Sequence, residues 1–360
     1  MLYNFLPNSN ESNWFQDFLI GLVKEVLHAK SSDTKARAWK DVVVGQHSDA
    51  LRRKRGLKSR YETLCKAAES LPAAEAQQFL DCLELAGYYK DVLTGAVAYM
   101  EPPGMTADLK EAIKSLFEFG FELLSDLQDT PIDDFSIRDG LYRRAYHAMP
   151  GHFCPFCGID RFDAPHPDMP RHALDHYLAI SIYPLFGAHL PNLVPMCGRC
   201  NSSFKLAADM LRAVDGSRRV CVDPYGDQVA KVSLMNSEPF GGGENGQLPK
   251  WVIDFDPAID AFETWDDVFS IRLRYKESVL DAEYKAWLQD FARWAEVSQL
   301  AVTNGQEASA ALKRWAALFP DLNDQGFIKR PVFEMLAASA LRADVAGSRV
   351  TDLVKALCAM

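Results

Sequence analysis

Two Cys-x-x-Cys pairs stand out in the sequence as residues that could bind a metal ion. The pairs are Cys154 with Cys157 and Cys197 with Cys200, and together they supply four thiolates. Four thiolates complete the tetrahedral shell of a zinc ion and leave no open position for water or substrate. We therefore predict a structural zinc site at these four cysteines, which folds the surrounding chain and does no chemistry itself.

Five polar residues with chemical potential lie between the two pairs or directly after the second. They are Asp175, His176, Asn192, Asn201 and Lys205. The surrounding residues predict a strand at 174–178, a second extended segment at 192–196 and a helix at 201–211. Neighbouring strand residues face opposite ways, so Asp175 and His176 can share a site only at a bulge or at a strand end.

The stretch from residue 152 to residue 206 resembles the HNH endonuclease family. The ββα-metal motif of that family runs Asp-His, then Asn-Leu-x-x-x-Cys, then Cys-x-x-Cys followed by His or Asn, with a Lys nearby. The matching residues in this chain are Asp175-His176, Asn192-Leu193, Cys197-Gly198-Arg199-Cys200-Asn201 and Lys205. Asn201 at the third position makes this an HNN variant of the motif. The stretch has 55 residues, and with its flanks the resemblance covers about 70 of the 360 residues.

The resemblance implies a metal-dependent endonuclease that hydrolyses phosphodiester bonds in DNA. Such hydrolysis needs a deprotonated water, and His176 is the candidate general base because its ordinary pKa lies near neutrality. By resemblance, Asp175 and Asn201 bind one Mg²⁺, with Mn²⁺ as the alternative, through the oxygen atoms that hard cations prefer. Asn192 would brace the loop and orient His176, and Lys205 would contact phosphate. Taken singly, Asp175 is as easily a surface carboxylate and His176 a structural histidine.

The charge of the chain limits how it can meet nucleic acid. The formal net charge is -10, the wrong sign for a protein that coats nucleic acid by bulk electrostatics. Residues 30–60, here called the basic segment, run against this trend with ten Lys and Arg against three acidic residues. The basic segment is either a phosphate-binding arm beside the active site, or a solvated helix face or docking surface for an acidic partner.

The remaining sequence predicts a mainly α protein with a small α+β insert. Apolar residues at three- and four-residue spacing predict helices within residues 13–145, at 57–69, 73–89, 106–126 and 132–148. Strands are predicted at 219–225, 251–255 and 269–275, a loop at 241–247, and helices at 331–342 and 348–357. We expect three domains, a helical region at 1–145, a zinc-stapled ββα-metal (HNH) nuclease domain at 146–225, and an α+β then helical region at 226–360.

The other cysteines and the N-terminus point to an intracellular protein. Cys65, Cys82, Cys221 and Cys358 are scattered singly, which is no disulfide framework, and we expect them to be small buried side chains. The N-terminus lacks the basic and apolar regions of a signal peptide, and no apolar run is long enough to span a bilayer. We expect a cytoplasmic protein without a membrane partner.

Three functions therefore stay open. The first is a Mg²⁺-dependent HNH nuclease that cuts DNA, and the second is a non-catalytic zinc module that binds nucleic acid or a protein. The third is an effector subunit whose nuclease is aimed by a partner such as an ATPase, because HNH proteins with long helical extensions resemble effectors of bacterial anti-phage defence. Residues 146–225 carry seven basic and seven acidic residues, so this stretch alone would bind DNA weakly.

Overall fold

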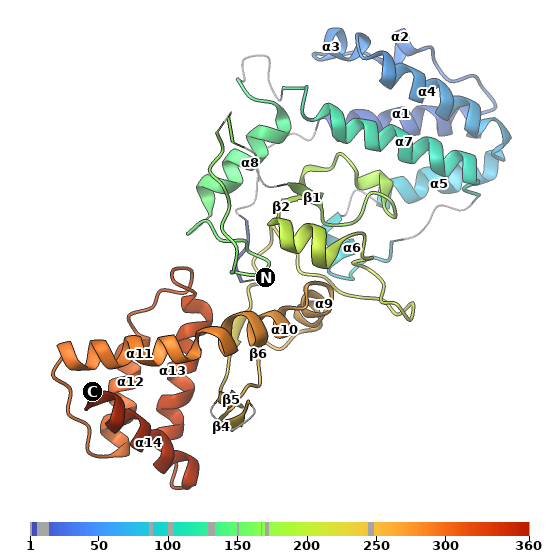
Figure 1. Ribbon diagram of the computed structural model, residues 1–360. Helices are drawn as coiled ribbons and strands as arrows, with labels where there is room; N and C mark the ends of the chain where they lie inside the picture. Colours follow the sequence, from blue (N-terminus) through green and yellow to red (C-terminus); the bar gives the residue numbers. More distant parts are fainter. Residues whose placement is uncertain are drawn as a thin grey trace. The chain divides into compact units, whose positions relative to one another are not determined.

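The structure is a computed structural model that describes residues 2–5, 14–85, 89–99, 104–128, 134–149, 151–166, 168–169, 173–243 and 248–359. Helices make up 55% and strands 7%, so the prediction of a mainly α fold with small β elements is confirmed. The chain forms two compact units, one of residues 5–149 and 162–227, the other of residues 1–4, 150–161 and 228–360 (Figure 1). The predicted HNH domain and its boundaries stay predictions.

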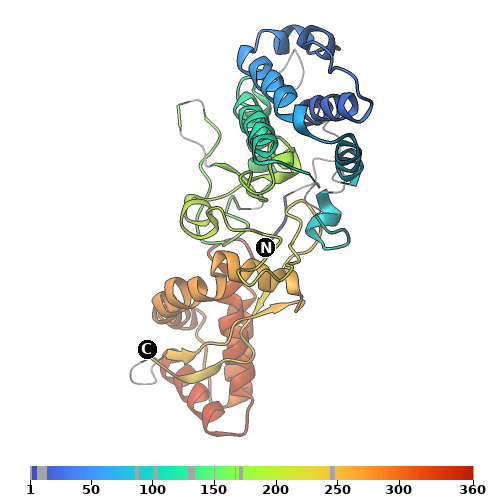
Figure 2. The ribbon, with the colours of Figure 1, turned by 90° about the vertical axis from the view of Figure 1, so that its right-hand side faces the viewer.

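The first unit is built on four long amphipathic helices (Figures 1 and 2). They are α1 (Trp14–Ser31), α4 (Arg55–Ala67), α5 (Ala73–Leu85) and α7 (Ala107–Leu123). Helix α1 packs against the other three, because its apolar residues recur along one face and are buried there. The shorter elements are α2 (Trp39–Val42), α3 (Ser48–Arg52), η1 (Ala68–Ser70), α6 (Tyr89–Leu93) and α8 (Ile137–Ala148).

Helices α7 and α8 each begin directly after a capping side chain. The side-chain oxygen of Thr106 accepts a hydrogen bond from Leu109 N, and that of Ser136 accepts one from Asp139 N. From the sequence, Asn13 is the expected N-cap of α1 and Pro102-Pro103 is an expected helix break, but these residues lie outside the described part of the chain.

The stretch that carries the candidate site continues the same unit. Strand β1 (Leu174–His176) pairs antiparallel with β2 (Leu193–Pro195), and Asp175 lies opposite Val194. Two 3-10 turns, η2 (Pro184–Phe186) and η3 (Leu190–Asn192), lie between them, and one π-helical segment, η4 (Cys200–Lys205), follows. Four leucines of this stretch join the core formed by α1, α4, α5 and α7, namely Leu174, Leu185, Leu190 and Leu193.

The predicted helix at 201–211 is too long. The helical segment ends at Lys205, and Leu206 follows with a φ of 48°. A residue other than glycine seldom adopts this left-handed conformation, and it turns the chain away from the helix axis. Residues 207–214 form turns and bends instead of continuing a helix.

The second unit combines two small sheets with a helical bundle. Strand β3 (Lys231–Ser233) pairs with β6 (Asp254–Asp256), and β4 (Glu238–Gly242) pairs with β5 (Leu248–Lys250). The helices are α9 (Asp260–Phe269), α10 (Ile271–Tyr275), η5 (Lys276–Leu280), α11 (Asp281–Val297), α12 (Gly305–Ala316), α13 (Gly326–Ala340) and α14 (Val345–Cys358). Strands β3 and β4 both contact α13, and the yellow strands lie along the red helices in Figure 2.

Several predictions for this part of the chain are corrected. Residues 269–275, predicted as a strand, comprise the end of α9, a turn at Ser270 and α10, and residues 219–225 contain no strand. The strand predicted at 251–255 begins only at Asp254, and the loop predicted at 241–247 begins after β4, with residues 244–247 outside the described chain. Helices near 331–342 and 348–357 are confirmed, and α13 begins five residues before Pro331. Every described helix is too short or too polar to cross a bilayer.

Candidate functional site

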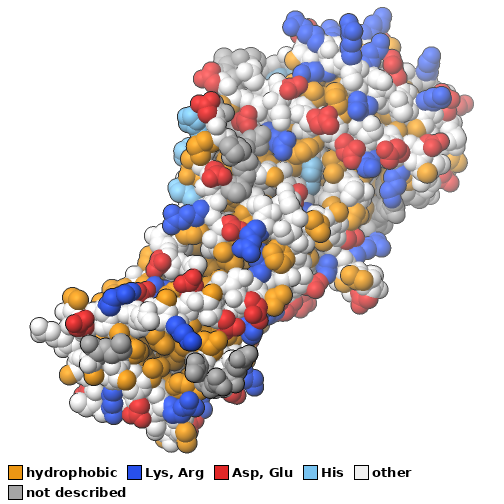
Figure 3. All heavy atoms as spheres, viewed as in Figure 1, with side chains coloured by type: hydrophobic (Ala, Val, Ile, Leu, Met, Phe, Trp, Pro, Cys, Tyr) orange, Lys and Arg blue, Asp and Glu red, His pale blue; other side chains and the backbone are white. Residues whose placement is uncertain are grey.

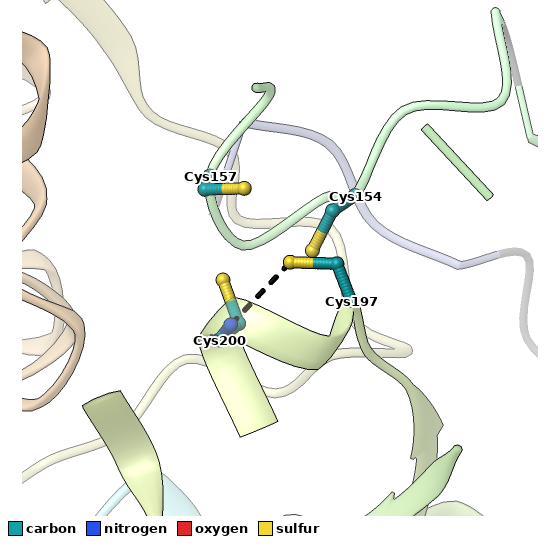
Figure 4. A group of neighbouring side chains, drawn as sticks. All are labelled: Cys154, Cys157, Cys197 and Cys200. Atoms are coloured by element: carbon teal, nitrogen blue, oxygen red, sulfur yellow. Dashed lines mark hydrogen bonds between the residues drawn. The ribbon is translucent and has the colours of Figure 1, made fainter. Parts of the chain in front are cut away.

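The four predicted zinc ligands come together. The sulfur atoms of Cys154, Cys157, Cys197 and Cys200 all lie within 4.8 Å of one another, and all four residues are buried. Figure 4 shows the four side chains facing a common centre. Four thiolates this close repel one another unless a cation lies between them, so the donor set fits a structural zinc ion. Within the described ranges, no other group of three or more His, Cys, Asp or Glu side chains can share a metal.

Backbone N–H groups support the thiolates. Ile159 N donates to the Cys157 sulfur over 3.5 Å, and Cys200 N donates to the Cys197 sulfur over 3.4 Å (dashed in Figure 4). A hydrogen bond to a thiolate favours its charged form, which is the form that binds zinc. Cys221 differs, because its sulfur donates to Met210 O and burial raises the pKa of its thiol to about 12.

A glycine makes the first cysteine turn possible. Gly158 has a φ of 67°, and its N–H donates to Cys154 O over 2.7 Å, which closes the turn. A Cβ at this position would lie 2.4 Å from Leu2 and 2.7 Å from Phe327. Any other residue here would suffer both backbone strain and a clash.

His176 is held in one tautomer at the end of β1. Its Nε2 lies 2.8 Å from Gly187 O, and because a carbonyl oxygen only accepts, Nε2 carries the hydrogen. The lone pair of the neutral ring is then on Nδ1. Burial lowers the pKa of His176 to about 4, so the ring is neutral at pH 7.

The surroundings of His176 explain its burial. The ring of Phe121 on α7 lies 4.3 Å from the imidazole, centroid to centroid, and leaves His176 only 8% exposed. The Arg138 guanidinium covers the Phe121 ring at 4.4 Å. A Cβ on Gly187 would lie 2.6 Å from the end of the Ile180 side chain and 3.0 Å from Phe117, so this segment packs closely against its neighbours.

Asp175 forms an ion pair with Lys205. Asp175 Oδ2 lies 2.7 Å from Lys205 Nζ, at an angle too bent for a hydrogen bond. The side chain of Lys205 is 1% exposed and that of Asp175 is 18% exposed. Lys205 Nζ also donates to Leu206 O over 3.4 Å. The residue expected to contact phosphate therefore neutralises the carboxylate expected to bind Mg²⁺.

Asn192 uses its whole amide group to close the loop between β1 and β2. Its Oδ1 accepts hydrogen bonds from Leu178 N over 2.7 Å and from Tyr89 OH over 3.1 Å. Its Nδ2 donates to Leu178 O and to Phe186 O, each over 3.1 Å. The side chain is fully buried. Because both ends of the loop bind one amide, Asn192 fixes the segment that carries Gly187.

Asn201 is the second residue of η4 and is half-buried. Its N–H donates to Cys197 O over 2.9 Å, which places it directly above the second cysteine turn. The structure thus brings Asp175 and Lys205 together. Between the described side chains of Asn201 and Asp175 there is no hydrogen bond. The assigned roles of these residues stay predictions.

Three residues that shape the site carry no signal in the sequence. Phe121, Tyr89 and Gly187 contact His176 or Asn192, yet each reads in the sequence as an ordinary core aromatic or turn glycine. No model of a known protein family, no curated protein and no solved structure matches this chain. Its own geometry must therefore carry the functional inference.

Proposed function

We propose that this chain is a metal-dependent endonuclease that hydrolyses phosphodiester bonds in DNA with an HNH-like site. The observation that supports this most is the hydrogen bond from His176 Nε2 to Gly187 O. A general base needs a neutral ring with its lone pair held in one direction, and a backbone carbonyl on the opposite nitrogen provides this. In the proposed reaction, His176 Nδ1 takes the proton of the attacking water.

The proposed catalytic metal is Mg²⁺, held by Asp175 and Asn201. Carboxylate and amide oxygens suit this hard cation, and two protein ligands suffice because Mg²⁺ keeps several waters. Lys205 Nζ lies 2.7 Å from Asp175 Oδ2 and neutralises it, so Mg²⁺ would have to displace this ammonium from the carboxylate. The bound ion would neutralise charge on the scissile phosphate. The zinc in the cysteine cluster would have no part in the chemistry.

Plasmid cleavage tests the proposal. Supercoiled plasmid is incubated with zinc-loaded protein with and without Mg²⁺, using wild type, His176→Ala and His189→Gln. His189 is a matched control, because burial also lowers its pKa to about 4 and it lies in the loop between β1 and β2. We expect Mg²⁺-dependent nicking that falls by about 10²- to 10⁴-fold in His176→Ala and persists in His189→Gln. Equal cleavage by His176→Ala and wild type would remove His176 as the base.

The alternative is a non-catalytic zinc module that binds nucleic acid or a protein. The observation in its favour is that His176 is only 8% exposed beneath Phe121 and that Asp175 is paired with Lys205. This alternative predicts no metal-stimulated cleavage of DNA or RNA, and one His176-dependent cut rejects it.

A protein partner belongs to the proposal as a source of DNA affinity. Residues 146–225 have balanced charge, so a subunit such as an ATPase, in an anti-phage complex, would bring the nuclease to DNA. We expect this chain to co-elute with such a partner subunit in size-exclusion chromatography. Tight DNA binding by the chain alone would make the partner unnecessary.

A further inference from the structure

The basic segment borders a cavity that the nuclease site does not use. The cavity has a volume of about 860 Å³ and lies between the end of α1, residues 34–38, the start of α2 and one face of α4. Small-molecule sites typically occupy about 300–1,000 Å³, so this space suits a compact ligand. In Figure 3, Lys and Arg side chains gather along the upper edge of the molecule, over α2 and α3.

The walls of the cavity carry surplus positive charge. Five basic residues line it, against the acidic residues Glu62 and Glu69. They are Lys30, Lys35, Arg37, Lys40 and Lys58. Lys30 Nζ donates to the backbone oxygen of Glu69, which satisfies a hydrogen bond but leaves the charge uncompensated. Lys58 approaches Glu62 only to 3.6 Å at an exposed position.

Lys35 and Lys40 are the residues that the fold leaves for a ligand. Both are exposed, and neither forms an ion pair or a side-chain hydrogen bond with any part of the chain that the structure describes. Both residues line the same cavity. An anion placed there gains two charge-assisted hydrogen bonds without breaking any existing one.

The segment that carries Lys35 is held in place. Arg37 is bound to Glu25 by three contacts, from its backbone N over 2.9 Å, its Nε over 2.9 Å and its terminal amino group over 2.8 Å. The hydrogen bonds from Arg37 lower the pKa of Glu25, which keeps this contact charged. Thr34 N also donates to Ala29 O over 2.8 Å. A wall fixed in advance loses little entropy when a ligand binds.

The floor of the cavity is apolar. Val26 is 3% exposed and Tyr61 is 2% exposed, and the Tyr61 hydroxyl is already used, because it donates to Arg37 O over 2.8 Å. A ligand in this space therefore meets lysines at its edge and an apolar surface beneath. This combination fits a molecule with an anionic group and a flat apolar part.

We propose that this cavity binds a small organic phosphate, with the phosphate at Lys35 and Lys40 and a ring over Val26 and Tyr61. The concave shape between these parts of the chain favours a compact ligand over the backbone of a DNA duplex, which needs an open surface along its length. This site goes beyond the proposed nuclease function and contains none of its residues.

Isothermal titration calorimetry on the full-length, zinc-loaded chain tests the proposal. ADP, pyrophosphate and adenosine are the ligands, chosen to separate phosphate and ring. We expect ADP to bind tighter than pyrophosphate and adenosine to bind weakest. The substitutions Lys35→Ala and Lys40→Ala should each weaken ADP binding roughly tenfold, because each substitution removes one hydrogen bond to a charged group.

The matched control is Arg53→Ala with Arg55→Ala. These arginines are exposed, belong to the same basic segment and do not line the cavity. ADP affinity should stay within about threefold of wild type in this control, since only diffuse charge is lost. Equal weakening by both pairs, or no binding of ADP and pyrophosphate, overturns the proposal. Binding of a DNA duplex that needs Lys35 and Lys40 while ADP fails to bind would assign the cavity to nucleic acid instead.

The titration is independent of cleavage. The His176→Ala protein should bind ADP as wild type does, because His176 is not part of the cavity. If the wild-type protein binds ADP but does not nick plasmid in the presence of Mg²⁺, only the nuclease proposal is rejected. If it nicks plasmid but does not bind ADP, only the phosphate site is rejected.

Discussion

Replacing Asp175 with Asn would leave the ammonium of Lys205 buried without its counter-charge. Only one hydrogen bond would remain to it, the 3.4 Å contact with Leu206 O, and the side chain is 1% exposed. Removing one partner of a buried ion pair costs about 3–5 kcal/mol, because the remaining charge has neither water nor partner. We expect Asp175→Asn to lower the free energy of unfolding by an amount in that range.

Removing the lysine instead of the carboxylate should lower the free energy of unfolding much less. Lys205→Met keeps the buried aliphatic stem and leaves Asp175, whose side chain is 18% exposed and can be hydrated. The expected loss is about 1–2 kcal/mol, the usual penalty for a polar group with incomplete partners. In the double variant, the buried charge is gone, so the total loss should be smaller than the sum of the two single losses.

Urea unfolding at neutral pH with saturating zinc measures these differences. Pulse-labelling hydrogen exchange of peptides from residues 174–206 reports this part of the chain separately from the second unit. Equal costs for the two single variants, or additivity within about 0.5 kcal/mol, would refute the reasoning from burial. The result matters for function, because an inactive Asp175→Asn protein shows a lost metal ligand only if that protein is folded.

Three further predictions follow from the same geometry. Cys200→Ala should lose the bound zinc, measured by elemental analysis, whereas Cys221→Ala, a buried thiol outside the cluster, should keep one equivalent. Asn192→Ala should lower the free energy of unfolding by about 2–4 kcal/mol, because the backbone groups of Leu178 and the Tyr89 hydroxyl would be buried without a hydrogen-bond partner. Urea unfolding midpoints measure this loss. Burial lowers the pKa of His189 from 6.5 to about 4, so the unfolded chain binds a proton in this range that the folded chain does not, and stability should fall as pH drops from about 6.5 to about 4. His189→Gln should flatten this decline, and urea midpoints at about pH 5 and pH 7 that decline equally in both proteins would contradict it.

The sequence predicted the long helices of the first unit well, for a simple physical reason. Each helix buries one face, so apolar residues recur every three or four positions, as in α1 and α7. Helix α5 begins at Ala73, directly after Pro72, which cannot continue a preceding helix. The cysteine cluster was predictable because metal ligands must be of particular types at short spacing.

Residues 269–275 show where periodicity fails. Ile271, Leu273 and Tyr275 alternate with arginines, which predicts a strand with the arginines outside. In the structure the segment is helical, Leu273 is 60% exposed and Arg274 is 5% exposed. Arg272 binds Glu263 through two hydrogen bonds of 2.7 Å, a pairing set by helix α9 and not visible in the local pattern.

The candidate site was predicted in its residue types but not in its surroundings. Phe121, which covers His176, comes from a distant helix. The positive φ at Leu206, where η4 ends, was not predicted because the position holds no glycine. The burial of Lys205 was also unpredictable, since lysine is almost always exposed and is tolerated inside only with a partner. These features depend on tertiary contacts between distant segments.

The long helices and the β1–β2 stretch share one core, and this limits how the motif can be separated from the rest of the chain. Gln16 of α1 donates to Leu185 O over 2.6 Å, and Tyr89 of α6 donates to Asn192. A fragment cut at residue 146 would expose Leu185, Leu190 and Leu193 to water and lose the Tyr89 bond. Transplanting the short motif into another scaffold would therefore transfer the ligands without their support. In this protein the helices and the β1–β2 stretch share one core, so separating them would remove the contacts that hold the stretch in place.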